Sequence, residues 1–431
     1  MEYSIIFIFF ALLLFTTKTT WSFGGVDAHP LYFVFLTQIL ILTLPGVLIL
    51  TFLDDCVGSI TCEIVTFETK IKVMFDYFII LITILLAVLF SYLIVQGRKD
   101  FMPAALSKIR YLNLCFFITI LIILLKIIFV KQVPLIMALI GNKEAAEIQK
   151  AAILRGEDGF SFPIINFLIK YFPLYFYYSV LISYFKRKVG LFYLLMAFFA
   201  TSLAMLYDLQ KAPVVIMIIG SFWLYWAYFG KTKMIIIGAI LSLGLVSLLF
   251  YVSYDFGGDN NYFVNAILNR TFVAQDDGMY WVYQYYNNLP NKEFYAYWGI
   301  PLAQQFGLPQ IDPLSDIIGV VFPDASDSWV NTTTFLLGEA KAIFGNYSLM
   351  VSAFVVFINV TIIMVVSSLL MRISKDVFYP AIFVMLQTIP FANNITDLLY
   401  GRFIFGFLVF MLFPAIFCML CYGKMSKRDA T

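Results

Sequence analysis

The sequence has almost no histidine, and His29 is the only one among 431 residues. This scarcity excludes most histidine-based metal sites, and His29 itself, beside a predicted membrane span, is expected to be structural. The five cysteines do not have zinc-site spacing. Cys418 and Cys421 lie in an apolar run, whereas Cys56 and Cys62 can pair if their loop is outside the cell membrane. We therefore predict no metal site and no cofactor.

Charge is also scarce, at 13% of residues, against about 25% in soluble proteins. Hydrophobic residues make up 62%, and the mean hydropathy is +0.91. About 20 apolar residues cross the bilayer core as a helix. The first apolar run lacks the basic residues and the cleavage site of a signal peptide, so it counts as a span. The sequence predicts an all-α polytopic membrane protein with about eleven spans, at 3–17, 31–53, 77–95, 111–130, 163–184, 190–206, 213–228, 234–254, 347–370, 377–391 and 403–422.

The distribution of charge predicts the orientation of these spans. With the N-terminus outside and the C-terminus in the cytoplasm, the cytoplasmic loops hold 15 of the 28 Lys and Arg residues, and 22 of the 26 acidic residues lie outside. Positive charge concentrated in short cytoplasmic loops is the usual pattern. The chain is then a single integral membrane domain, 1–431, with one large extracytoplasmic loop at 255–346.

The large loop is acidic and rich in aromatic residues. It has ten Asp or Glu, three Lys or Arg, and 18 aromatic residues. Its aromatic side chains either form a belt at the membrane surface or stack on sugar rings. For stacking on a glycan, Tyr280, Trp281 and Trp298 are the candidates.

Four cations come from four different outside segments: Arg155, Lys211, Arg270 and Arg402. If they converge, they suit a single anionic group at the membrane surface, such as a lipid-linked pyrophosphate, because arginine binds phosphate in a bidentate manner. The same cations would stabilise charge that develops on a pyrophosphate leaving group. Each of them could instead snorkel or pair with an acid.

A sugar hydroxyl that acts as nucleophile is helped by a general base, and no histidine lies in the outside segments. The base must then be a carboxylate, and the candidates are Asp276, Asp277 and Glu339. Adjacent residues of a helix point about 100° apart, so only one of Asp276 and Asp277 can face a site. Any of the three could equally be solvated or salt-bridged. The loop contains no Asp-x-Asp motif, which weakens the case for a metal-dependent glycosyltransferase.

Three short segments resemble parts of the O-antigen and capsule repeat-unit polymerases (Wzy-type). NTTTFLLGEAKAIFGNYS (331–348) is similar to their Gly-Glu and Phe-Gly signature after the large loop. NRTFVAQDDGMYW (269–281) is similar to the arginine-containing segment early in that loop, and DLQKAP (208–213) to their short cationic turn. The order of the spans, with the large loop late in the chain, is similar too.

This resemblance implies a GT-C-like glycosyltransferase in the bacterial inner membrane. It would join undecaprenyl-pyrophosphate-linked oligosaccharide repeat units, transferring the nascent chain from a donor to a new acceptor unit. It implies phosphate-binding roles for Lys211 and Arg270, and it places Glu339 at the family's Gly-Glu position. Possible further partners are a chain-length regulator and a flippase; no nucleic-acid partner is expected.

Three alternatives stay open at this stage. An O-antigen ligase-like transferase has the same layout, but those enzymes carry a histidine late in the large loop, where this chain reads NTTTFLLGE. A lipid-linked glycan flippase or transporter would show repeats or charges at the membrane midplane, and neither is evident. A structural membrane scaffold would leave the four outside cations without a shared purpose.

Overall fold

The computed structural model describes residues 2–19, 29–54, 56–95, 108–154, 163–207, 212–231, 233, 236–238, 240, 244, 268–301, 303–323, 334–392 and 394–422, and within these ranges every regular element is a helix. The elements before the large loop are α1 (Glu2–Thr19), α2 (Pro30–Val34), the π-helical η1 (Phe35–Thr43), α3 (Leu44–Phe52), η2 (Cys56–Gly58), α4 (Thr61–Ile64), α5 (Phe67–Val95), α6 (Lys108–Phe129), α7 (Pro134–Leu139), α8 (Lys143–Leu154), α9 (Pro163–Phe185), α10 (Leu191–Leu206) and α11 (Ala212–Phe229).

The remaining elements form the large loop and the last membrane helices. They are the π-helical η3 (Asn269–Val273), α14 (Asp277–Tyr285), η4 (Tyr286–Asn288), η5 (Tyr295–Tyr297), η6 (Ala303–Phe306), α15 (Pro313–Val321), α16 (Leu336–Phe344), η8 (Gly345–Tyr347), α17 (Ser348–Ile373), α18 (Lys375–Leu386), η9 (Pro390–Ala392), α19 (Ile395–Leu399) and α20 (Arg402–Tyr422).

Several of these helices suit a bilayer by length and composition. Four helical stretches of the described chain are long and apolar enough to cross it: Pro30–Phe52, Phe67–Val95, Tyr111–Phe129 and Leu336–Ile373. Shorter apolar helices lie at Ser4–Thr17, Leu191–Leu206, Pro213–Phe229 and Arg402–Ile416. Within the described residues the prediction of an all-helical chain is thus confirmed, and its long apolar helices are compatible with a membrane protein.

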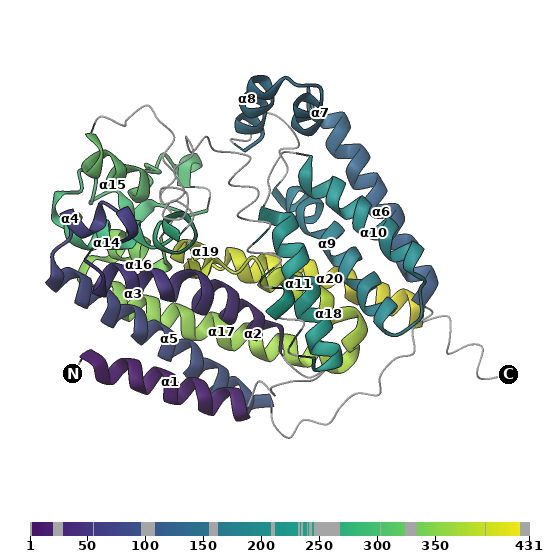
Figure 1. Cartoon of the computed structure of the whole chain (residues 1–431), viewed down its shortest axis with the longest axis horizontal. Helices are drawn as coiled ribbons and strands as arrows, with labels where there is room; N and C mark the ends of the chain where they lie inside the picture. Colours follow the sequence, from purple (N-terminus) through teal and green to yellow (C-terminus); the bar gives the residue numbers. More distant parts are fainter. Residues whose placement is uncertain are drawn as a thin grey trace.

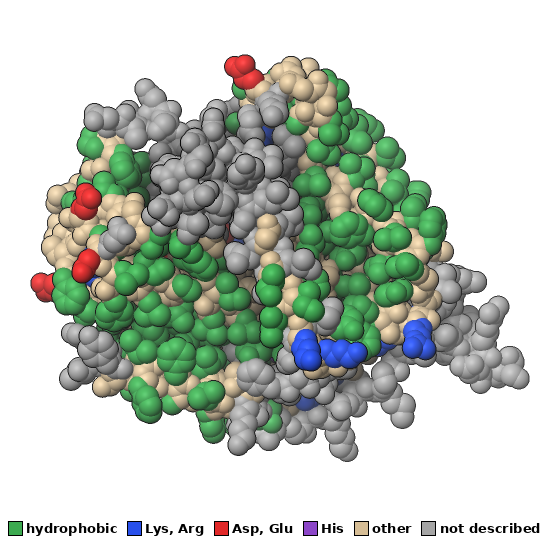
Figure 2. All heavy atoms as spheres, viewed as in Figure 1, with side chains coloured by type: hydrophobic (Ala, Val, Ile, Leu, Met, Phe, Trp, Pro, Cys, Tyr) green, Lys and Arg blue, Asp and Glu red, His purple; other side chains and the backbone are tan. Residues whose placement is uncertain are grey.

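The outer faces of these helices are apolar. Large hydrophobic side chains such as Phe7, Ile128, Phe192, Phe354 and Phe405 are exposed, and Figure 2 shows apolar side chains covering the flanks of the molecule. Soluble monomers rarely expose contiguous apolar patches of this kind. Lipid contact explains the exposure.

Most predicted spans coincide with helices, and the departures have local causes. Helix α5 begins ten residues before the predicted span at 77–95, which adds about 15 Å to it on the loop side. The predicted span at 377–391 is a 12-residue helix, α18, followed by a 3₁₀ turn at Pro390, because proline cannot continue the helix. Most of the predicted span at 234–254 lies outside the described residues.

The membrane helices form two groups (Figure 1). In one group α5 packs along α17 and α1, and in the other α9 packs along α10, α6 and α11. Helix α18 contacts α9, α20, α17 and α2, so it joins the two groups.

One end of the molecule carries bonded cations. Arg372 Nη2 donates to the Val95 carbonyl oxygen at 3.0 Å, and Lys186 forms an ion pair with Asp376. Lys and Arg side chains gather along the lower edge in Figure 2. These residues belong to the loops that the charge pattern predicts to be cytoplasmic.

The large loop folds onto the other end of the helices. Helix α14 packs against α16, α15 and α5, and η3 packs against α3. Gly338 permits the close approach of α16 to α14, because a Cβ there would lie 2.0 Å from Thr334 Oγ1 and 3.1 Å from Met279 Cα. Helices α14 and α16 therefore pack closely, and we call this pair the α14–α16 platform. The three candidate carboxylates, Asp276, Asp277 and Glu339, lie in these helices or directly before them.

Candidate functional site

Two of the four predicted pyrophosphate-binding cations, Arg155 and Lys211, lie outside the described residues. The predicted convergence can therefore be followed only for Arg270 and Arg402. The structure places these two in separate clusters, one built around Asp277 and the other around Glu339.

Glu339 links three chain segments. Its carboxylate accepts hydrogen bonds from Trp298 Nε1 at 2.7 Å, from the Thr396 amide at 3.0 Å and from Thr396 Oγ1 at 3.1 Å. The residue is only 1% exposed, and these donors offset the cost of burying an acidic group. Glu339 thus ties α16 to the segment after η5 and to the first turn of α19.

The backbone after Trp298 is fixed by its neighbours. Gly299 has φ +74°, and a Cβ there would lie 2.8 Å from Thr396 Cβ, so both conformation and space require glycine. The side chain of Gln310 bonds to the backbone on both sides of Trp298. Its Oε1 accepts from the Gly299 amide at 3.1 Å, and its Nε2 donates to the Tyr297 carbonyl. The partly exposed Trp298 is held both by its indole and by the following peptide.

Arg402 is bonded to this same turn. Its Nη2 donates to the Gly299 carbonyl, and its Nη1 lies 3.6 Å from Asp397 Oδ1. The Arg402 side chain is still 46% exposed, and a guanidinium has five N–H donors. Burial raises the pKa of Asp397, while the adjacent Arg402 charge opposes that shift. Arg402 thus keeps N–H donors for a ligand while it is bonded to Gly299, the residue that follows the accessible indole of Trp298.

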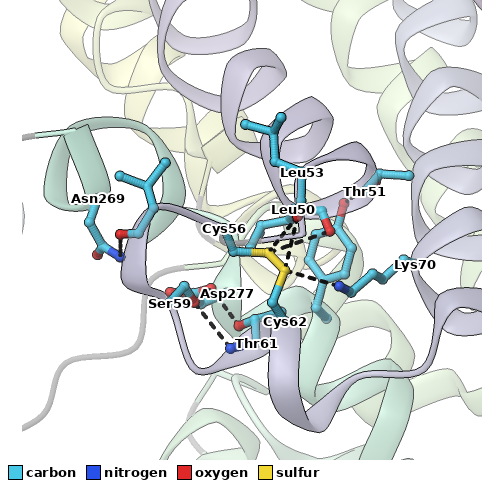
Figure 3. The surroundings of a disulfide bond; sticks show 12 residues. Leu50, Thr51, Leu53, Cys56, Ser59, Thr61, Cys62, Lys70, Asn269 and Asp277 are labelled. Carbon is cyan, nitrogen blue, oxygen red and sulfur yellow. Dashed lines mark hydrogen bonds between the residues drawn. A yellow bond between two sulfur atoms is a disulfide. The ribbon is translucent and has the colours of Figure 1, made fainter. Parts of the chain in front are cut away.

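Asp277, the first residue of α14, is tied to the segment between α3 and α5. Its Oδ1 accepts from Ser59 Oγ at 2.7 Å and from Thr61 Oγ1 at 2.6 Å. A disulfide between Cys56 and Cys62 closes this segment (Figure 3), so the pairing that the sequence left open is present. The disulfide therefore keeps the two hydroxyl donors, Ser59 and Thr61, within one short closed loop.

The environment of Asp277 moves its titration toward neutral pH. Burial raises its pKa to about 6, and the hydrogen bonds from Thr61 and Ser59 partly oppose the rise. A carboxyl group with such a pKa is largely ionised at pH 7 and still basic enough to take a proton.

The adjacent Asp276 has a different environment. It is fully buried, and neither carboxyl oxygen has a hydrogen-bond partner among the residues that the structure describes. Gly46 makes room for it, since a Cβ there would lie 2.4 Å from Asp276 Oδ2. Burial raises the pKa of Asp276 well above its usual value, and the Asp277 charge adds to the effect. Burial without a hydrogen-bond donor thus disfavours the ionised form of Asp276, which is the form that a general base requires.

Arg270 lies in η3, at the edge of the cluster around Asp277. The backbone of η3 is held by Asn269 Nδ2, which donates to the Val57 carbonyl at 3.2 Å, and by Gln275 Nε2, which donates to the Arg270 carbonyl at 3.3 Å. The Arg270 side chain is exposed, and within the described ranges its guanidinium has no hydrogen bond or ion pair. It is free to bind an anion.

The three predicted stacking residues differ in exposure. Tyr280 is fully buried, and its hydroxyl lies 3.0 Å from Thr51 Oγ1 and 3.1 Å from the Val47 carbonyl. Trp281 is 6% exposed and donates to Thr61 Oγ1 at 2.8 Å. Protein covers both rings, so they pack the α14 platform and offer no face to a glycan. Trp298 alone of the three is partly exposed.

Several residues of these clusters carried no clear sequence signal. Thr396 and Gly299 contact Glu339 and Arg402 across long stretches of chain, which no local pattern reveals. Ser59 and Thr61 lie between Cys56 and Cys62, and that cysteine pair was the one available hint.

The chain matches no known protein family, no curated protein and no solved structure.

Proposed function

We propose that the chain is a membrane glycosyltransferase that joins undecaprenyl-pyrophosphate-linked oligosaccharide repeat units into an O-antigen or capsular polysaccharide. One observation carries the proposal: the Arg402 guanidinium is bonded to the Gly299 carbonyl, directly after the accessible Trp298. An indole face suits a pyranose ring, and a guanidinium suits a pyrophosphate. A lipid-linked glycan presents these two chemical groups side by side.

In the proposed reaction, a hydroxyl of the acceptor sugar attacks the anomeric carbon of the donor glycan. The new glycosidic bond forms as the bond from that carbon to the pyrophosphate oxygen breaks, and the hydroxyl proton passes to Asp277. We propose that one bound substrate spans the two clusters, so that Arg402 from one and Arg270 from the other offset the negative charge that develops on the leaving undecaprenyl pyrophosphate. Arg155 and Lys211 are proposed to assist them. Glu339 is proposed to position Trp298 and Thr396 rather than to take part in proton transfer, because among the described residues its carboxylate already accepts hydrogen bonds from fixed protein donors.

The proposed orientation puts the clusters outside the cytoplasm. The Cys56–Cys62 disulfide lies at the end that carries the large loop, and disulfides persist in oxidising compartments. Bonded cations mark the opposite end, as expected for the cytoplasmic side. On this basis we propose an eleven-span, GT-C-like protein of the bacterial inner membrane, with its N-terminus outside and its C-terminus in the cytoplasm.

The test is a single-turnover assay of the purified protein in liposomes. Lipid-linked repeat units would be extracted from cells that lack the gene, and a chelator would be present throughout. The proposal expects a ladder of longer lipid-linked glycans that is lost in Arg402→Ala. Absence of elongation from a verified native substrate would contradict polymerisation, and transfer to a different acceptor would indicate the ligase alternative.

The structure does not favour the ligase alternative. His29, the only histidine, is 6% exposed and caps α2, with Nδ1 accepting from the Leu31 amide at 3.1 Å. This helix-capping hydrogen bond agrees with the predicted structural role of His29, which lies outside the large loop in the sequence.

A further inference from the structure

A second group of cations lies on the α14–α16 platform, away from Glu339 and Asp277. Lys341 of α16 is only 6% exposed. Its Nζ lies 4.8 Å from the ring centroid of Tyr286 and 5.5 Å from that of Tyr283. Its Nζ donates to Asn346 Oδ1 at 3.3 Å, and within the described chain no carboxylate lies within ion-pair distance of it. A buried ammonium normally requires a counter-charge, and two aromatic faces supply only part of one.

A second ammonium group approaches the same ring. Lys292 Nζ lies 5.0 Å from the Tyr286 centroid and donates to the Asn287 carbonyl at 3.0 Å. The two Nζ atoms are therefore no more than 9.8 Å apart, the sum of their distances to that centroid. Lysine stems are flexible, so both groups can reach one anion.

The third cation is Lys72 on the first turns of α5. Its charge interacts with both Lys341 and Asp76. Asp76 is the acidic group inside this cluster, and its Oδ2 is already engaged by the Tyr283 hydroxyl at 2.9 Å. Two ammonium groups, those of Lys72 and Lys341, thus act on one carboxylate, and Lys292 approaches from the Tyr286 side, which leaves an excess of positive charge.

The surroundings place the cluster at a membrane surface. Phe67, at the start of α5, is 67% exposed, and Tyr347 and Met350, at the start of α17, are 69% and 66% exposed. These are the first turns of two helices that are long and apolar enough to cross a bilayer. Aromatic residues at such positions mark the level of lipid headgroups. Phosphate groups of lipids lie at this depth.

We infer that an anionic lipid binds here at the extracytoplasmic surface of the membrane. Its phosphate group is bound by Lys341, Lys292 and Lys72, and its acyl chains lie along the exposed starts of α5 and α17. Lys341 forms the buried end of the site, and Lys292 and Lys72 form its open side. The hydroxyl of Tyr286 faces the Gly345 turn, where a Cβ would lie 2.5 Å from it, so the ring is held in place between the cations. This site does not depend on the proposed transferase activity.

The test is native mass spectrometry of the full-length protein in detergent, titrated with phosphatidylglycerol. The double variant Lys72→Gln/Lys292→Gln alters only the open side of the site, and its apparent Kd is expected to rise at least tenfold. The matched control Lys231→Gln alters an exposed lysine at the opposite end and should leave the Kd unchanged. Lys292→Arg should retain binding, because the charge is kept.

Two further arms identify the ligand. A neutral glycolipid should bind equally to wild type and double variant, and inorganic phosphate should not displace phosphatidylglycerol at matched concentration. Equal phosphatidylglycerol affinity in wild type and double variant would overturn the inference, as would full displacement by inorganic phosphate, which would point to a soluble ligand. Lys341→Gln is a further check only if the variant folds, because the residue is buried.

Discussion

The cations at the two ends of the molecule have different partners. At the end assigned to the cytoplasm, Lys186 pairs with Asp376 and Arg372 donates to the Val95 carbonyl, so these charges hold helices together. In the large loop, among the described residues, Arg270 is exposed without a hydrogen bond or ion pair from its guanidinium, and Lys341 is buried without a carboxylate partner. A cation that the protein itself does not neutralise is available to a ligand. Under the proposed function, this difference separates cations that hold helices together from cations that can bind a ligand.

The largest effect is expected from removing both described guanidinium groups of the proposed site. The double variant Arg270→Ala/Arg402→Ala should lower the single-turnover elongation rate about 1,000-fold, because each group stabilises the charge of the leaving pyrophosphate. Lys186→Ala, at the other end, should leave the rate unchanged and lower stability by less than about 1 kcal/mol, since its ion pair is partly exposed. Equal losses of activity in both proteins would remove the distinction between the two ends.

The next effect concerns the candidate base. Asp277→Asn should lower the elongation rate about 100-fold, because the amide cannot take a proton. In wild type the active form is the carboxylate, so the rate should fall as the pH drops below the Asp277 pKa of about 6. A pH–rate profile of wild type and variant checks both points. A variant that keeps the acidic fall in rate would assign that fall to another group.

A smaller effect is expected at Glu339, which positions its neighbours. In Glu339→Gln the side-chain nitrogen cannot accept a hydrogen bond, so one buried donor of Trp298 or Thr396 loses its partner. The expected cost is about 1–3 kcal/mol of stability, read as a lower melting temperature, with a higher KM and little change in kcat. Glu144→Gln, at an exposed position of α8, is the control. A loss confined to kcat would argue that Glu339 takes part in the chemistry.

The smallest effect on activity is expected at Asp276. Because burial raises the folded-state pKa of Asp276, the folded chain holds this proton to a higher pH than the unfolded chain, which loses it above about pH 4. Stability should therefore fall as the pH rises, by up to about 1.4 kcal/mol per pH unit. Asp276→Asn removes this dependence. The difference in melting temperature, variant minus wild type, should therefore be larger at pH 8 than at pH 5. A relative melting temperature independent of pH would show that Asp276 is ionised.

The sequence predicted an all-helical chain with long apolar helices, which the described residues confirm, whereas the eleven spans and the site residues stay predictions. Long apolar runs identify helices such as α5 and α17 because 20 consecutive apolar residues are rare in soluble proteins. The early start of α5 was missed because Lys70, Lys72 and Asp76 interrupt the apolar pattern while tertiary contacts with α14 still hold the helix. Hydropathy also cannot show a π-helical segment such as η1.

Site residues were predictable by type and poorly by environment. Arg270, Arg402 and Asp277 were chosen as charged residues in an outside loop, and their burial and partners depend on contacts distant in sequence. The difference between Asp276 and Asp277 arises from Gly46 on one side and from Ser59 and Thr61 on the other. No local pattern in the sequence encodes that difference.

The most direct test of the distinction between the two ends is the binding of undecaprenyl pyrophosphate to the purified protein, measured by native mass spectrometry. Wild type, Arg270→Ala/Arg402→Ala and Lys186→Ala would be compared at equal protein concentration. We predict an affinity at least tenfold weaker in the double variant and unchanged in Lys186→Ala. Unchanged affinity in the double variant would contradict the assignment of these cations to a pyrophosphate.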